Sequence, residues 1–297
     1  MQKRCLLAYW LFLGYNGGMN SKIPFIFVLV FLIGSCASVP VIEIPQFTRQ
    51  YYSFSILHTP EKPSDSHQLK LTMFLMKMNY PEEQAAFFNQ IIYSAKTLEE
   101  YKDRLIIEQR NSYRKKSPVT AVGAKNVNWR YSETIDVIES ADWVETTEAV
   151  HEKTVQNHGI IVRRITDIYP GENNAGKSTR YFVLDMDGLT HIKIDALFAN
   201  FQGDRRLRDL IYEELRKKTG LERGKSLSDG IFFSSEPELT FNFYFTKTGL
   251  GFHWDANQIA PLSNGDIEII LPWQTVRPLI QAGGIQILTK FNIHLFV

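Results

Sequence analysis

The stretch GENNAGKS carries every fixed position of a phosphate-binding loop, G-x-x-x-x-G-K-[ST]. In such loops backbone N–H groups wrap phosphates, the lysine reaches the terminal phosphate, and the hydroxyl binds magnesium. A working loop leads into the N-terminus of a helix. Here residues 179–184, TRYFVL, are β-branched and aromatic and predict a strand. We therefore interpret the motif as a polar turn between two strands and expect neither a nucleotide nor another cofactor. Its fixed positions are Gly171, Gly176, Lys177 and Ser178.

A second candidate for chemistry is the pair His253 and Asp255, two residues apart in a run that reads as a strand. Side chains two apart on a strand point to the same face, so a third ligand would complete a zinc site. The other interpretation is the polar face of a hairpin, and it is the one we adopt. We accordingly predict no metal site.

The remaining groups do not form a catalytic pattern. Asp185 and Asp187 flank a turn at Gly188, and we interpret them as turn acceptors rather than a metal-binding or acid–base pair. The sequence has no G-x-S-x-G motif, and Cys5 and Cys36 are its only cysteines, so we expect no free thiol nucleophile after processing. We predict no catalytic residues and expect a protein that is not an enzyme.

The N-terminal half reads as strands around one long helix. Residues 51–57 and 69–80 have strand patterns, and residues 127–166 read as a strand meander. A helical pattern begins at Pro81, a favoured residue in the first turn, and runs to about Arg110. Its apolar stripe consists of Phe88, Ile91, Ile92, Ala95, Leu98, Tyr101 and Leu105.

The C-terminal half contains a shorter helix and a hairpin. The helix ends at Gly220, a typical C-terminal cap, and buries Leu207, Leu210, Ile211 and Leu215. Residues 239–255 alternate in polarity around a turn at Thr248-Gly249. We expect one face of the hairpin to be buried and the other solvated. The buried face would hold Leu239, Phe241, Phe243 and Phe245, and the solvated face Asn242, Tyr244 and His253.

These elements predict an α+β fold, with antiparallel sheets packed against a long N-terminal helix and a second, shorter helix. The 297 residues are 44% hydrophobic and 22% charged, which is typical of a globular protein. The formal net charge is +1. Such a balance does not provide the concentrated basic face that nucleic-acid binding needs, so we expect no nucleic-acid partner.

The first 35 residues are typical of a signal peptide. Lys22 precedes an apolar run from Ile23 to Ile33, which is too short to span a bilayer, and small residues then lead to Cys36. Ile33-Gly34-Ser35-Cys36 resembles a bacterial lipobox, so we predict that Cys36 is lipidated. Translation would start at Met1 or at Met19, which begins a compact signal of its own.

Five blocks between about Gly159 and Ile280 carry a family resemblance. They are NHGIIVRRITDIY, RYFVLDMDGLTHIKIDALF, LRDLIYEELRKKTG, LTFNFYFTKTGLGFHWDANQIAPLSNGDIEIILPW and VRPLI. Together they resemble the extracytoplasmic domain shared by RsiV-type anti-sigma factors and PdaC-type peptidoglycan deacetylases. The strand and helix around Tyr80-Pro81 resemble the companion N-terminal module of the same proteins.

The resemblance implies four segments: a signal peptide (1–35), a lipidated tether (36–48), a PdaC-like module (49–158) and an RsiV-like domain (159–297). The chain departs from the pattern in the loop GENNAGK, which usually holds a Gly-Gly-Ala-His type sequence, and it lacks the acid pair and His-x-x-x-His spacing of the PdaC deacetylase domain. With at most 18 residues before the signal, we do not expect the sigma-binding segment of RsiV.

The expected function is therefore recognition rather than catalysis. The RsiV domain is a sensor that binds lysozyme, so the resemblance implies a protein ligand of that kind or a cell-wall ligand such as peptidoglycan. The alternative is a cell-wall hydrolase, a deacetylase accessory protein, or an enzyme whose active site is unrecognised. We expect the protein in the bacterial cell envelope, held by its lipid anchor to the outer membrane or the periplasmic face.

The lipidation of Cys36 is directly testable. Replacing Cys36 by Ser removes the thiol that would be acylated, so labelled palmitate should no longer enter the protein and signal cleavage should stop. A Cys36→Ser variant that still takes up label would refute the assignment.

Overall fold

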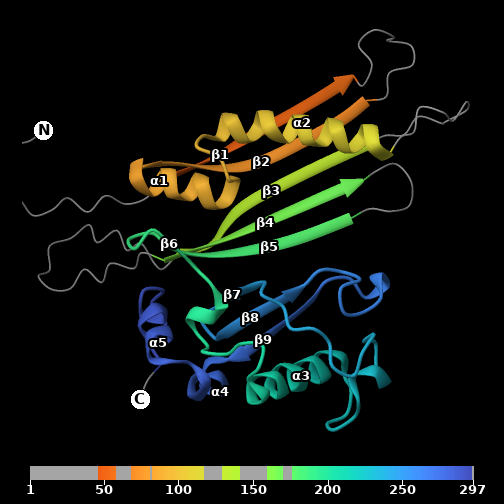
Figure 1. Cartoon of the computed structure of the whole chain (residues 1–297), viewed down its shortest axis with the longest axis vertical. Helices are drawn as coiled ribbons and strands as arrows, with labels where there is room; N and C mark the ends of the chain where they lie inside the picture. The colour runs from red at the N-terminus through yellow and green to blue at the C-terminus, as the bar shows by residue number, and fades with distance from the viewer. Residues whose placement is uncertain are drawn as a thin grey trace, which may run out of the picture. The chain divides into compact units, whose positions relative to one another are not determined.

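The computed structural model describes residues 46–57, 68–80, 82–116, 129–140, 159–169 and 176–295. The predicted signal peptide, Cys36 and Gly171 lie outside the described residues. None of the described helices is both long and apolar enough to cross a membrane. The fold mixes helices with a six-stranded and a three-stranded sheet (Figure 1).

The larger sheet has its strands in chain order, and neighbouring strands pair antiparallel with one exception. β2 and β3 pair in parallel, which corrects the prediction of antiparallel sheets. A parallel pair needs a crossover connection, and two helices supply it here. The strands are β1 (Gln46–Leu57), β2 (Gln68–Tyr80), β3 (Trp129–Ser140), β4 (Gly159–Tyr169), β5 (Gly176–Asp185) and β6 (Thr190–Ile192).

The predicted long N-terminal helix is wrong, because the chain forms two helices there. α1 (Glu82–Phe88) continues into a π-helical turn, η2 (Asn89–Tyr93), and α2 (Leu98–Lys116) begins after a break. At the break Ser94 adopts a left-handed conformation with φ 48°. Thr97 then caps the new helix, since its Oγ1 accepts from the Glu100 N–H at 3.1 Å. The spacing Thr97-x-x-Glu100 is a helix-start signal that the apolar stripe obscured.

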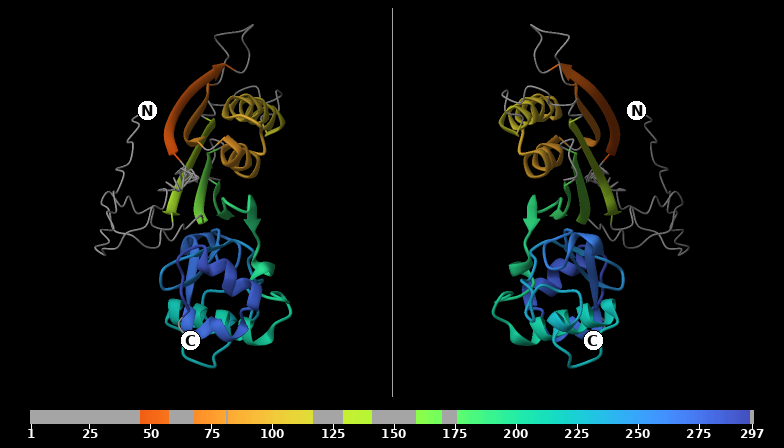
Figure 2. Two further views of the ribbon diagram at one scale, coloured as in Figure 1. Left: turned by 90° about the vertical axis from the view of Figure 1, so that its left-hand side faces the viewer. Right: turned by 90° about the vertical axis from the view of Figure 1, so that its right-hand side faces the viewer.

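Both helices nevertheless bury the predicted stripe against one face of the six-stranded sheet (Figure 2). Leu71, Met73 and Leu75 of β2 face them and are fully buried. A charged group lies in this core: Glu133 accepts from Tyr101 Oη at 2.5 Å and from Arg164 Nε at 2.5 Å. Because a buried carboxylate is costly unless it is paired, these bonds hold α2 to β3 and β4.

The predicted domain boundary at residues 158 and 159 falls inside this sheet. β3 ends before the boundary and β4 begins after it, yet the two strands pair over ten registered positions. The N-terminal and C-terminal segments of the prediction therefore share one continuous sheet.

The rest of the chain is built on the smaller sheet, formed by β7 (Phe243–Phe245), β8 (Gly249–Trp254) and β9 (Ile267–Pro272) in antiparallel order. Around it lie α3 (Arg205–Thr219), α4 (Trp273–Val276), α5 (Ala282–Thr289) and four 3-10 turns. These turns are η3 (Ile194–Ala196), η4 (Leu227–Asp229), η5 (Leu262–Asn264) and η6 (Arg277–Leu279).

α3 forms as its sequence predicts. Asp204 caps the N-terminus by accepting from the Arg206 and Leu207 N–H groups, and Gly220 caps the C-terminus at φ 69°. Leu207, Ile211 and Leu215 are fully buried, whereas Leu210 is half-buried. The polar and charged residues lie on the opposite face, as expected of an amphipathic helix.

The hairpin has the expected turn but not the expected faces. Leu239, Phe243 and Phe245 are buried as predicted, whereas Phe241 is 57% exposed and its ring lies 5.4 Å from that of Phe201. The prediction of a solvated opposite face is also wrong. Asn242, Tyr244 and His253 are all buried, because β5 of the larger sheet packs over them.

The two phenylalanines of the hairpin give a matched test of this burial. Phe243→Ala should lower the free energy of unfolding by ~3–5 kcal/mol, because it opens a cavity in the core. Phe241→Ala should cost about 1 kcal/mol or less, since that ring is already largely exposed. Urea unfolding of both variants measures the difference, and equal losses would contradict the assignment of faces.

Candidate functional site

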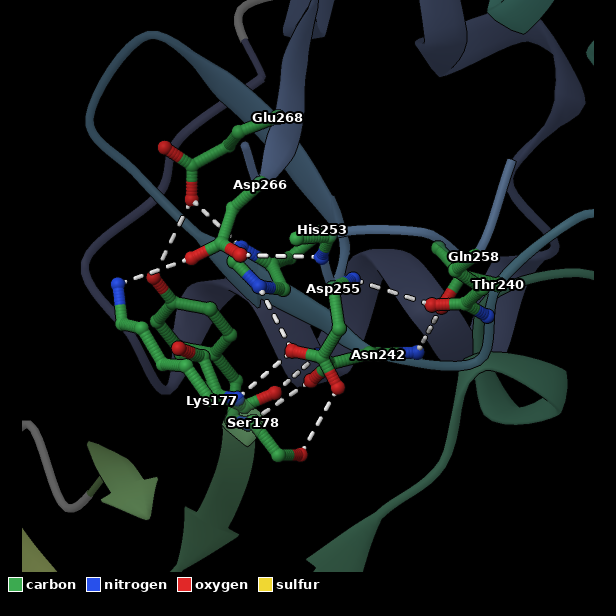
Figure 3. Close-up of polar contacts among 12 residues, drawn as sticks. Lys177, Ser178, Thr240, Asn242, His253, Asp255, Gln258, Asp266 and Glu268 are labelled. Carbon is green, nitrogen blue, oxygen red and sulfur yellow. Dashed lines mark hydrogen bonds and ion pairs between the residues drawn. The ribbon is translucent and has the colours of Figure 1, made fainter. Parts of the chain in front are cut away.

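Four ionisable side chains gather where β8 and β9 pair. His253 lies opposite Glu268 in the ladder, and Asp255 and Asp266 lie just beyond the same end of the two strands. Ligand atoms of His253, Asp255 and Asp266 all lie within 4.8 Å of one another. We call these four residues the His253 cluster (Figure 3).

Both carboxylate oxygens of Asp255 accept hydrogen bonds from the protein. Its Oδ1 accepts from the Thr179 N–H at 2.7 Å and lies 3.3 Å from His253 Nε2. Its Oδ2 accepts from the Ser178 hydroxyl at 2.8 Å. These bonds, to which the His253 charge adds, lower the pKa of Asp255 against the opposing effect of burial.

Asp266 is occupied in the same way. Its Oδ1 accepts from the Ala256 N–H at 3.1 Å, and its Oδ2 pairs with Lys177 Nζ at 3.0 Å. Asp255 and Asp266 thus reach three successive residues at the start of β5, Lys177, Ser178 and Thr179. Through these contacts the cluster ties the larger sheet to the smaller one.

His253 lies between two carboxylates, with Asp255 on its Nε2 and Glu268 Oε1 3.7 Å from its Nδ1. Burial alone would lower the pKa of His253. The hydrogen bond to Asp255 and the ion pair with Glu268, together with the charges of Asp255 and Asp266, outweigh burial and raise that pKa to about 9. The imidazole is therefore a cation at neutral pH.

Two stacked tyrosines lie beside Glu268. The rings of Tyr181 and Tyr244 lie 4.3 Å apart, and Tyr181 donates to Glu268 Oε1 at 3.2 Å. Burial, reinforced by the Glu268 charge, raises the pKa of Tyr181 to about 12. Gly251 makes room for this stack, because a Cβ there would lie 2.3 Å from the Tyr244 ring. The stack places a tyrosine of β5 flat against β7.

Asn242 completes the contact because its side-chain amide pairs with the edge of β5 as the backbone of a neighbouring strand would. Its Oδ1 accepts from the Tyr181 N–H at 2.9 Å, and its Nδ2 donates to the Thr179 carbonyl at 2.7 Å. β6 pairs only with Val183, Leu184 and Asp185, so it leaves this part of the β5 edge open. The amide of Asn242 thus satisfies backbone groups that would otherwise be buried without partners.

The residues of the phosphate-loop motif take up structural positions. Gly176, Lys177 and Ser178 open β5, so a strand follows the motif as predicted. The contacts of Lys177 and Ser178 with Asp266 and Asp255 did not follow from the sequence. Two residues of the motif therefore belong to the site as partners of carboxylates, which is not the phosphate-binding role that the motif describes.

The His253 cluster has the residue types of a metal site, but its carboxylates already pair with other groups of the protein. A divalent cation would compete with Ser178 for Asp255 and with Lys177 for Asp266, and it would have to displace the proton from His253. As arranged, the cluster forms a charged hydrogen-bonded link.

The turn prediction for Asp185 is confirmed. Its Oδ1 accepts from the Gly188 N–H at 3.1 Å, and Asp187 lies in the same turn. Asp185 also forms an ion pair with Lys290, beyond the end of α5, which the sequence did not indicate. The carboxylate is 4% exposed, and this pairing compensates its burial.

The C-terminal part matches a known domain. Residues 195–274 match the family model "Protein of unknown function (DUF3298)". This segment is similar to the DUF3298 family. It contains α3, all three strands of the smaller sheet and the His253 cluster, whereas β5 and its contacts to the cluster lie outside the matched residues.

Two crystal structures of DUF3298 family proteins have similar folds. BF2082 from Bacteroides fragilis has a TM-score of 0.61 at 17% identity, with 83% of this chain and 97% of that chain covered. PA4972 from Pseudomonas aeruginosa has a TM-score of 0.50 at 11% identity, with 80% and 96% covered. At these identities the likeness shows the fold alone. No curated protein matches the chain.

The raised pKa of His253 predicts a fall in stability at alkaline pH. The imidazole binds its proton more tightly in the folded state, so its full contribution is present below pH ~6.5 and is lost as pH rises to about 9. A shift of this size corresponds to ~3 kcal/mol. The lowered pKa values of Asp255 and Glu268 act oppositely, with a loss below pH ~4.

Urea unfolding between pH 5 and pH 9.5 measures this dependence. The wild-type curve should decline above pH 6.5, and His253→Gln should be less stable at pH 6 but flat over the same range. An equally steep decline in His253→Gln would assign the effect to other groups.

Proposed function

We propose that this chain is a non-enzymatic recognition protein of the bacterial envelope and that its DUF3298 domain binds a protein ligand. The observation that carries the proposal is the state of the His253 cluster. Both carboxylate oxygens of Asp255 and of Asp266 already accept hydrogen bonds from the protein. These bonds hold the two carboxylates to the start of β5 and to the loop after β8. Groups that hold two sheets together instead suit a rigid binding module.

The surface that we assign to the ligand is the loop between β8 and β9. Leu262 lies on it and is 61% exposed, the largest exposed fraction among the large hydrophobic side chains of the described residues. The loop is internally fixed, because the Asn264 N–H donates to the Pro261 carbonyl and Gly265 adopts φ 67°. An apolar side chain on a fixed loop loses little conformational entropy on binding.

The kind of ligand comes from the resemblance to the RsiV domain, whose ligand is lysozyme. A cell-wall ligand is the other candidate that this resemblance implies. The exposed Leu262 favours the protein, since apolar anchors surrounded by polar groups are typical of protein interfaces. In this proposal the lipid on Cys36 would hold the domain in the envelope, at the outer membrane or the periplasmic face.

The proposal can be tested with the mature chain immobilised on a sensor surface and lysozyme in solution. We expect saturable binding that Leu262→Asn weakens at least tenfold without lowering the melting temperature, because the side chain is exposed. Asn264→Ala should weaken binding similarly. Ile285→Asn, an exposed apolar position on α5, is the matched control and should bind like the wild type.

Two outcomes would count against the proposal. Folded protein that captures nothing from lysozyme-rich fluid would contradict the protein-binding role. Release of reducing ends or acetate from peptidoglycan by the purified chain would instead support the alternative of a cell-wall hydrolase or deacetylase, and a loss of that activity in His253→Gln would place it at the cluster.

A further inference from the structure

On the second face of the six-stranded sheet, the core of the smaller sheet covers β4 to β6 and buries Ile161, Val183 and Ile192. The part of this face formed by β1 to β3 is not covered by any described helix or strand. α1 and α2 pack on one face only (Figure 2). The opposite face, which we call the open face, carries the alternate residues of β1 to β4. Its exposed aromatic residues are Tyr51 at 59%, Phe74 at 48% and Tyr169 at 39%.

The strand register arranges this face in rows. Tyr51 pairs with Phe74 across β1 and β2, and their ring centroids lie 4.8 Å apart. Two residues further along lies a row of hydroxyl groups, formed by Ser53, Thr72 and Ser132. The next row holds cations and the third aromatic ring, in the order Lys70, Arg130 and Tyr169.

Arginine is placed beside the aromatic rings at both ends of this pattern. The Arg130 guanidinium lies 5.8 Å from the centre of the Tyr169 ring. At the other end Asp136 is shared by Arg49 at 3.7 Å and Arg163 at 3.5 Å, so two cations face one carboxylate. The Arg49 side chain is 79% exposed and can pair with a further anion.

The charges on the open face do not balance. Among the described side chains that β1 to β4 place on this face, four cations, Arg49, Lys70, Arg130 and Arg163, stand against the carboxylates of Asp136 and Asp167. The four rows span ~20 Å along the strands, since alternate residues of a strand are ~6.7 Å apart. The partner must therefore be extended, anionic, and able to use aromatic rings and hydroxyl groups.

We propose that the open face binds a glycan chain whose sugars carry carboxylates. Sugar rings have apolar faces that pack on exposed aromatic rings, and their hydroxyl groups match the row of Ser53, Thr72 and Ser132. The carboxylates would pair with the arginines, which hold such groups with two parallel hydrogen bonds. A folded protein would need a larger apolar centre than Tyr51 and Phe74 provide.

This site is separate from the loop that carries Leu262, so each can be tested without the other. The probe is soluble, un-cross-linked peptidoglycan glycan strands, titrated against the mature chain by calorimetry. The matched comparison is the same strands with their carboxylates converted to amides. We expect binding to the carboxylated strands and at least tenfold weaker binding to the amidated ones.

Variants then locate the contact. Tyr51→Ala and Arg130→Ser should each weaken binding at least tenfold, and Arg130→Ser should also reduce its dependence on salt. The control variants are Phe233→Ala, which removes a ring that is 58% exposed elsewhere, and Arg206→Ser on α3. Both should bind the strands like the wild type, and all four should keep the wild-type melting temperature.

Three results would overturn the assignment. Equal binding of carboxylated and amidated strands would remove the role of the cations. Equal binding of poly-L-glutamate would show that charge alone, without sugar, is recognised. Tighter binding of single-stranded oligo-dT than of the glycan would assign the aromatic and cationic rows to nucleic acid instead.

Discussion

The contact between Asn242 and the edge of β5 is the interaction on which the arrangement of the C-terminal part depends. β6 is too short to pair with the whole of β5, so the backbone groups of Thr179 and Tyr181 face the smaller sheet unpaired by any strand. Leaving such groups buried and unsatisfied would cost ~1–3 kcal/mol each. The amide of Asn242 offers one acceptor and one donor at the spacing of a strand edge and satisfies both residues. The polar side of the hairpin is thereby held against β5 and becomes an interior surface.

The charges of the His253 cluster follow from that burial. Once β5 covers the hairpin, His253 is 5% exposed and its charge must be compensated within the protein. Asp255 and Glu268 supply this compensation, while Lys177 and Ser178 occupy the remaining carboxylate oxygens. The same solution appears in the other core, where Arg164 compensates Glu133. In both places residue types that are common in active sites hold elements together, because a buried charge is tolerated only when it is paired and hydrogen-bonded.

Because these polar residues hold the elements together, we assign recognition to surfaces that do not take part in the packing. The helices cover one face of the six-stranded sheet, and the smaller sheet contacts the edge at β5. The open face and the loop carrying Leu262 are presented by rigid strands rather than by long flexible segments. Our two proposals assign a different ligand to each of these surfaces.

The sequence by itself determined the elements whose cause is local. The alternation of Leu71, Met73 and Leu75 placed β2 with its buried face, and the stripe and caps of α3 followed from Asp204 to Gly220. The strand after Ser178 and the turn at Asp185 could likewise be predicted, because β-branched runs and turn acceptors influence the conformation of residues next to them in the chain. Even the break before α2 had a local signal at Thr97.

Only the tertiary structure decided the parallel pairing of β2 with β3, the exposure of Phe241 and the burial of His253. The hydrogen bond between Ser178 and Asp255 joins residues 77 positions apart, and that between Lys177 and Asp266 joins residues 89 apart. Hydrophobic periodicity reports which side of a segment is apolar, but it does not report which polar side a distant strand edge will cover. That depends on where β5 lacks a neighbouring strand, a property of the assembled sheet and not of any segment within it.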